Sequence, residues 1–176
     1  MLRRGFTLIE ILVIIGIITI LTSFLILYSR TGENQILLLR EKAKVINNIL
    51  RAKAMALNLV VESEPACGFG VHFEESRYFI FRDSALDPRE CFIDSEHRRY
   101  SGEQSGEMLT DEIFNLDSSL RFSRLAVTDV FFRPPQPEAF LDGEQTLPEA
   151  EIILATQDNR SSVRIIINNA GQISSE

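Results

Sequence analysis

The hydrophobic and polar positions divide the chain into three regions, of which the first is almost entirely apolar. From Phe6 to Tyr28 the only charged side chain is Glu10. At about 1.5 Å per residue, a helix over this stretch is about 35 Å long, which is enough to cross the roughly 30 Å hydrocarbon core of a bilayer. The pattern therefore predicts a membrane-spanning helix over residues 6–28.

The second region, residues 29–64, has the pattern of an amphipathic helix. Apolar side chains recur at helical spacing while most charged ones fall elsewhere, and the repeating positions are Leu39, Ala43, Ile46, Leu50 and Leu57. We expect this stripe to be the face that packs on the rest of the protein. The helix is expected to run on from the apolar segment to about Glu62, because Pro65 lacks a backbone donor and disfavours helix before it.

The third region, residues 65–176, alternates short apolar runs with turn-forming residues. These runs predict two hairpins and two further strands, at residues 70–73 with 78–81, 152–155 with 163–167, 127–132, and around Ile173. Residues 83–106 are polar and acidic, which predicts a loop-rich segment. The predicted fold class is α+β: a long N-terminal helix, membrane-spanning in its first half and amphipathic in its second, packed on an antiparallel β-sheet domain.

The charge distribution indicates which side of the membrane each region occupies. The chain has 176 residues with 18 basic and 25 acidic side chains, for a formal net charge of −7. Arg3 and Arg4 precede the apolar segment, and positive residues stay on the cytoplasmic side, so the body is expected outside the cytoplasm. Without these two arginines the balance is 16 basic against 25 acidic residues, or −9. Such a body repels phosphate backbones, which argues against general DNA binding.

Glu10 is the unusual residue of the apolar segment. A carboxylate at the centre of an inserted helix costs about 2.5 to 3.5 kcal/mol, and less near the interface. One interpretation is a side chain that reaches the cytoplasmic headgroups. The other is a functional charge that awaits a cationic partner within the membrane. The charge alone leaves both open.

The residues around Glu10 form a motif that bears on its role. The sequence Gly5-Phe6-Thr7-Leu8-Ile9-Glu10, after a short basic leader and before about twenty apolar residues, resembles the class III signal of type IV pilins and pseudopilins. The resemblance implies that residues 1–5 are a leader, that a prepilin peptidase cuts between Gly5 and Phe6 and methylates Phe6, and that Glu10 guides assembly. The implied partners are that peptidase, other pilin or pseudopilin subunits and the inner-membrane assembly platform.

The rest of the chain indicates which members of this family it resembles. Many major pilins carry a proline in the second half of this helix, and none occurs between Phe6 and Glu64, which favours a minor pilin or pseudopilin. The long helix, the first hairpin and the C-terminal hairpin resemble minor pseudopilins of the GspH/FimT type. The expected protein is then a structural subunit without cofactor, single-pass in the inner membrane and later part of a type IV pilus or a type II secretion pseudopilus. A DNA-uptake minor pilin and a single-pass anchored exoplasmic enzyme remain as alternatives.

Few residues elsewhere in the sequence suggest catalysis or metal binding. His72 and His97 are the only histidines, and no nucleophile motif or ligand spacing accompanies them, so we expect neither catalytic nor metal-binding residues. His72 alternates with apolar neighbours and is expected on the solvent face of a strand. The acidic residues of segment 83–106 could bind calcium, but they lack EF-hand spacing, so a solvated loop is favoured.

Cys67 and Cys91 are the only cysteines. Both lie in the part expected outside the cytoplasm, where disulfides persist. They bracket the first predicted hairpin, so strand pairing could bring them within bonding distance. The sequence therefore makes them a candidate disulfide, with two separately buried thiols as the alternative.

Overall fold

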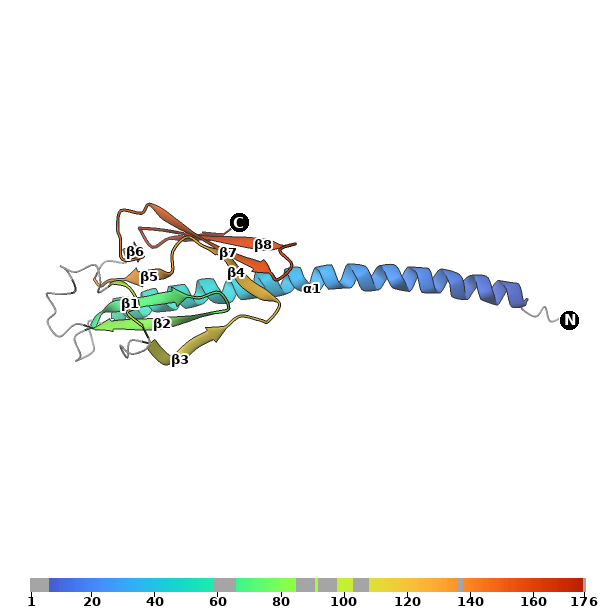
Figure 1. The fold of residues 1–176 in the computed structure, drawn as a ribbon, viewed down its shortest axis with the longest axis horizontal. Coiled ribbons are helices and arrows are strands. Elements are labelled where there is room, and N and C mark those ends of the chain that lie inside the picture. Colours follow the sequence, from blue (N-terminus) through green and yellow to red (C-terminus); the bar gives the residue numbers. More distant parts are fainter. Residues whose placement is uncertain are drawn as a thin grey trace. The chain divides into compact units, whose positions relative to one another are not determined.

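The computed structural model shows one long helix and nine strands in the part of the chain it describes (Figure 1). The described residues are 7–58, 66–84, 91, 98–102, 108–135 and 138–175. The α+β class predicted from the pattern is confirmed. Helix α1 (Leu8–Asn58) runs through two compact units, residues 1–37 and 38–176. The predicted helix end near Glu62 lies outside the described residues.

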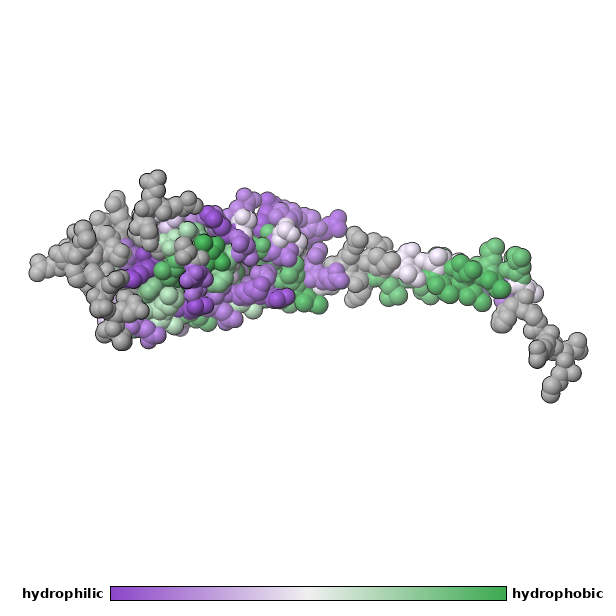
Figure 2. Space-filling model, turned by 90° about the horizontal axis from the view of Figure 1, so that it is seen from below, coloured by the Kyte–Doolittle hydropathy of each residue, from purple (hydrophilic) through white to green (hydrophobic). Residues whose placement is uncertain are grey.

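The first unit carries the apolar part of α1, green in Figure 2. Every side chain from Leu8 to Leu25 is exposed. In the described residues this is the one helical stretch long and apolar enough to cross a membrane.

The second unit contains two antiparallel sheets. Sheet A has the strand order β3-β2-β1-β5-β6, and sheet B has the order β4-β7-β8-β9. The bounds are β1 (Ala66–Phe73), β2 (Arg77–Ser84), β3 (Met108–Asn115), β4 (Leu120–Leu125), β5 (Asp129–Phe132), β6 (Ala139–Leu141), β7 (Glu149–Thr156), β8 (Ser162–Asn168) and β9 (Ile173–Ser175). Both predicted hairpins are present, as β1 with β2 and β7 with β8. The predicted strand at 127–132 is shorter, and β3, β4 and β6 were not predicted.

Helix α1 buries one face in the second unit, but not the face expected from the sequence. The buried apolar side chains are Leu38, Val45, Ile49, Ala52 and Ala56. The predicted stripe is wrong, since Leu39, Leu50 and Leu57 are 52%, 46% and 42% exposed. Both sets repeat at helical spacing, and they lie on adjacent faces of the same helix.

The main core lies where α1 meets the inner faces of both sheets. Asn48 of α1 donates a hydrogen bond to the Tyr78 hydroxyl of β2 at 2.9 Å. Tyr78 pairs with Phe73 of β1, so these two side chains share the face of sheet A that looks toward the helix. Phe122 of sheet B meets both rings edge-on, at centroid distances of 5.6 Å to Phe73 and 6.1 Å to Tyr78.

The outer face of sheet A is also buried. Its apolar side chains, together with Cys91 from the segment after β2, form a second cluster, the outer cluster, made of Cys67, Phe79, Phe81, Cys91, Phe131 and Phe140. Tyr100 packs against it from the segment between β2 and β3. Because both faces of this sheet are covered, its strands lack the regular apolar and polar alternation of a half-exposed sheet.

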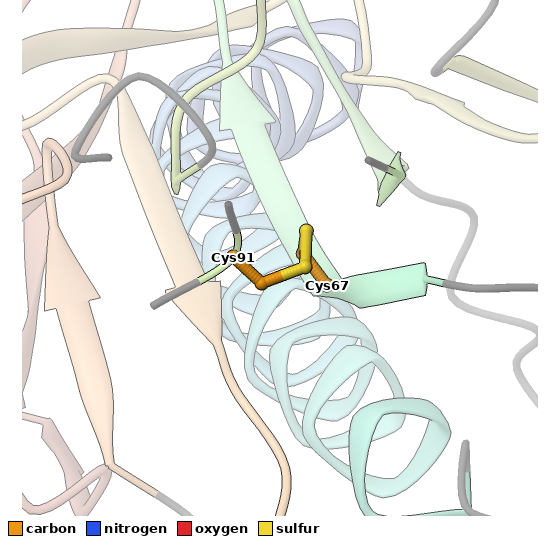
Figure 3. The surroundings of a disulfide bond; sticks show 2 residues. All are labelled: Cys67 and Cys91. Carbon is orange, nitrogen blue, oxygen red and sulfur yellow. A yellow bond between two sulfur atoms is a disulfide. The ribbon is translucent and has the colours of Figure 1, made fainter. Parts of the chain in front are cut away.

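The predicted disulfide is present. Cys67 and Cys91 are bonded, with their Cα atoms 5.1 Å apart (Figure 3). Cys67 lies near the start of β1, where the pairing with β2 has an irregularity between Ala66 and Gly68. Both cysteines belong to the outer cluster, so the bond attaches the segment that follows β2 to sheet A.

Candidate functional site

The N-terminal residues singled out by the sequence centre on the start of α1. Gly5 and Phe6 lie outside the described residues. Thr7 is the first described residue, and its backbone and side-chain oxygens accept hydrogen bonds from the Glu10 backbone N–H at 3.1 and 3.4 Å. Thr7 is therefore the N-cap of the helix, and it satisfies a donor that would otherwise lack a partner.

Glu10 occupies the third position of the first helical turn, and its side chain is exposed. The spacing Thr7-x-x-Glu10 is that of a capping box, in which Glu or Gln at this position favours helix initiation. The carboxylate also lies near the positive end of the helix dipole. Within the described residues it forms no salt bridge. The cap was not foreseen from the sequence, although the threonine-to-glutamate spacing could have indicated it.

The apolar stretch satisfies its own hydroxyl groups. Thr19 donates to the carbonyl of Ile15 at 2.8 Å, Thr22 to that of Ile18 at 2.7 Å, and Ser23 to that of Thr19 at 2.8 Å. Such bonds to the preceding helical turn remove the need for water around these groups. In hydrocarbon, polar groups must be satisfied internally. Glu10 is thus the remaining side chain between Leu8 and Leu25 that would demand a partner there.

The comparison with protein families identifies this region. Residues 1–26 match the prokaryotic N-terminal methylation motif. The N-terminus is a class III signal of the type IV pilin family. The signal covers the leader, the cleavage region and the apolar helix, and it implies processing by a prepilin peptidase and assembly with other pilins. With the apolar helix it fits a membrane-anchored precursor. Neither the curated proteins nor the solved structures gave a match.

His72 does not lie on a solvent face, contrary to the sequence-based expectation. Its side chain is 19% exposed, and its Nδ1 lies 2.8 Å from Oδ1 of the buried Asp129. The rings of Phe79 and Tyr100 lie 5.1 and 4.9 Å away. The expectation failed because the segment carrying Tyr100 covers this face of sheet A.

The Asp129 carboxylate accepts two hydrogen bonds besides its contact with His72. Thr128 donates to Oδ2 at 3.1 Å, and the Tyr100 backbone N–H donates to Oδ1 at 3.4 Å. This network joins β1, β5 and the covering segment. In the described part of the chain no three His, Cys, Asp or Glu side chains come together as a metal site would require. His97 and most of segment 83–106, including the possible calcium ligands, lie outside that part.

A groove of about 620 Å³, with a mixed polar and apolar lining, lies between α1 and β3. Its lining includes Tyr78, Asn48 and the ion pair of Glu41 with Lys44, at 2.5 Å. Burial raises the pKa of Tyr78 to about 12, while the bond from Asn48 acts in the opposite direction and the Glu41 carboxylate adds to the rise. The tyrosine is therefore a neutral structural group at ordinary pH.

Proposed function

We propose that this protein is a minor pilin or pseudopilin, a structural subunit of a type IV pilus or a type II secretion pseudopilus, and not an enzyme. The observation that carries the proposal is the class III signal followed directly by an exposed apolar helix. Arg3 and Arg4 would stay in the cytoplasm of the inner-membrane precursor, with the body on the other side.

Processing creates the charge that Glu10 needs. Cleavage between Gly5 and Phe6 removes both leader arginines and leaves an α-amino group on Phe6, which the peptidase then methylates. This ammonium and the Glu10 carboxylate are each costly in an apolar helix bundle, but together they neutralise one another. Within one chain they are separated by about 6 Å of helical rise, so pairing between neighbouring subunits satisfies them more directly. A buried pair of this kind contributes more to register than to net stability.

Glu10 has two possible roles, capping of the helix and charge pairing between subunits. Two substitutions distinguish these roles. Glu10→Gln keeps a side chain suited to the capping box but removes the charge, whereas Glu10→Val removes both. If the charge pair drives assembly, both variants are inserted and cleaved but reach the filament at roughly a tenth or less of the wild-type level. Mass spectrometry of the N-terminus and recovery in sheared filaments measure the two steps. Normal incorporation of Glu10→Gln would assign Glu10 to the cap alone.

Gly5→Leu is the matched variant for processing. It should block cleavage, so that the leader stays attached and the precursor remains in the membrane. Met1 to Gly5 retained on wild-type protein in assembled filaments would overturn the proposed processing. An anchored enzyme, by contrast, would keep its leader and tolerate the loss of Glu10.

A further inference from the structure

Strand β3 forms one edge of sheet A, and among the described residues its one neighbour in the sheet is β2. The Leu116 N–H donates to the Ser76 carbonyl at 2.9 Å, in the register that continues into β3. Because hydrogen-bonded pairs alternate along an antiparallel ladder, Phe114 also bonds to β2, whereas Ile113 and Asn115 direct their N–H and C=O groups to the open edge. In the part of the chain that the structure describes, no hydrogen bond from outside sheet A reaches these groups.

The open edge lies beside the groove between α1 and β3. The rings of Tyr78 and Phe114 stack on the face of sheet A that looks toward α1, with their centroids 5.2 Å apart. Tyr78 is buried, whereas Phe114 is partly exposed and lines the groove together with Asn47 of α1. A salt bridge from Arg51 to Glu112 joins α1 to β3 beside it. The volume of about 620 Å³ falls within the range of about 300 to 1,000 Å³ that is typical of ligand sites.

An extended peptide along this edge would use both features. It would exchange main-chain hydrogen bonds with Ile113 and Asn115, which continue the antiparallel ladder. The peptide residue opposite Phe114 would then place its side chain on the same face as that ring, in the groove. Since the ring is apolar and partly exposed, an apolar side chain is favoured at this position.

The other sheet edges in the described residues are less suited to an added strand. Strands β6 and β9 have three residues each, against eight in β3. On β4 the N–H of Phe122 already donates to the Glu75 carbonyl at 3.0 Å, outside the pairing with β7. Strand β3 is therefore the edge that offers free main-chain groups next to a groove.

The uncompensated charges beside this edge are acidic. Asp111 and Asp117 precede and follow its open part, both are exposed, and neither forms a salt bridge within the described residues. Hydrogen bonds from Ser119 lower the pKa of Asp117, so this carboxyl group is charged at neutral pH. Lys44 and Arg51, the cations of α1 beside the groove, are already paired with carboxylates. Basic side chains at the ends of an incoming peptide would therefore be attracted.

We propose that the edge of β3 binds an extended segment of a different protein by β-strand addition, with an apolar residue opposite Phe114 and Lys or Arg at both ends. A second copy of this chain suits the edge less well, because two paired β3 edges would bring Asp111 and Asp117 of both copies close together, and like charges across a strand pair are destabilising. This binding requires neither cleavage nor filament formation, so it goes beyond the proposed function and can be tested separately from Glu10.

The test uses the full chain in nanodiscs of zwitterionic lipid and a fluorescent peptide of seven residues, Lys-Val-Thr-Val-Thr-Val-Lys. With the central valine opposite Phe114, the two threonines direct their N–H groups to β3 and the valine directs its own away. N-methylation of both threonines should therefore weaken binding, measured by fluorescence anisotropy, about tenfold or more. N-methylation of the central valine should change it by less than about threefold. Replacing both lysines with glutamate should weaken it by about fivefold.

Two substitutions at one position test the same bond from the protein. Asn115→Pro removes an N–H that faces the open edge, where a strand tolerates proline, and should weaken binding about tenfold or more. Asn115→Ala is the matched control, because it keeps this N–H, and should bind the peptide within about threefold of the wild type. The N-methylated peptides are measured on the unaltered protein, so a folding defect in Asn115→Pro cannot account for both results.

Equal binding of the two N-methylated peptides, or undiminished binding to Asn115→Pro, would overturn the proposal. Disulfide cross-linking of two Asn115→Cys chains within one nanodisc would also overturn it, because the edge would then hold a second copy. Each of these results would leave the Glu10 experiment unaffected.

Discussion

The Phe81 ring occupies the space that a side chain at Gly70 would need. The two residues are paired across β1 and β2, and a Cβ atom at position 70 would collide with the ring and lie 3.0 Å from the Val130 carbonyl oxygen. A Cβ atom at Gly68 would collide with the backbone carbonyl oxygen of Phe132 and with the ring of Phe131. The sequence Gly68-Phe69-Gly70 therefore serves the packing of the outer cluster.

Gly70→Ala should accordingly destabilise the protein. Overpacking of this kind costs about 1 to 3 kcal/mol, since the ring has to move within a filled cluster. Urea unfolding measures the loss. Gly32→Ala is the matched control, because nothing lies within 4 Å of the added Cβ and alanine favours a helix. If both variants were as stable as the wild type, the close approach of Phe81 would be refuted.

Loss of the bond between Cys67 and Cys91 should lower stability by about 3 kcal/mol, as expected for a closed loop of this size in the entropy model. The double variant Cys67→Ser/Cys91→Ser should also expose the outer cluster to hydrophobic dyes. Thermal unfolding with and without reductant provides the measurement. Two free thiols titrated in the denatured, non-reduced protein would contradict the bond.

Tyr78 should make stability fall in alkaline solution. Its pKa is about 12 in the folded protein against 10.0 ordinarily, so above pH 10 the unfolded chain loses this proton while the folded protein keeps it. The free energy of unfolding then decreases with pH until the folded tyrosine titrates, by at most about 2.7 kcal/mol in all. Tyr78→Phe removes this dependence, although it leaves Asn48 without its acceptor. Parallel alkaline profiles for the two proteins would be the contrary result.

The second half of α1 should be indispensable to the body. A fragment of residues 31–176 keeps Leu38, Val45 and Ile49 and is expected to unfold cooperatively. A fragment of residues 64–176 loses all three, at about 1.5 to 3 kcal/mol per large side chain, against a typical total stability of about 5 to 15 kcal/mol. Circular dichroism melts compare them. Cooperative unfolding of the shorter fragment at a similar temperature would remove α1 from the core.

The predictable features were those that depend on local sequence. The apolar run, the two hairpins and the helix follow from periodicity and turn residues, and the class III signal follows from six consecutive residues. Predicting the disulfide needed one further inference, namely that the body lies outside the cytoplasm, where disulfides persist. Strands β4 and β6 were not predicted because the polar residues Arg121, Ser123 and Arg124 interrupt the apolar pattern of β4 and because β6 has only three residues.

The incorrect predictions concern which face of a helix or strand is buried. Leu39 and Val45 both belong to apolar stripes of α1, and helical spacing cannot say which stripe the sheets will cover. His72 looked solvent-facing because the segment that covers it is distant in sequence and has no regular pattern. Glu10 illustrates a third limit, since the same residue suits a helix cap and an intersubunit charge pair.

The bonds from Lys42 to Ser175 and from Lys53 to Gly171 bring the last described residues to α1. A polypeptide fused after β9 therefore leaves the body close to Lys42 of α1. A fluorescent protein or affinity tag attached there would cover the exposed side chains of α1 around Lys42. A label meant to follow assembly therefore belongs elsewhere on the chain.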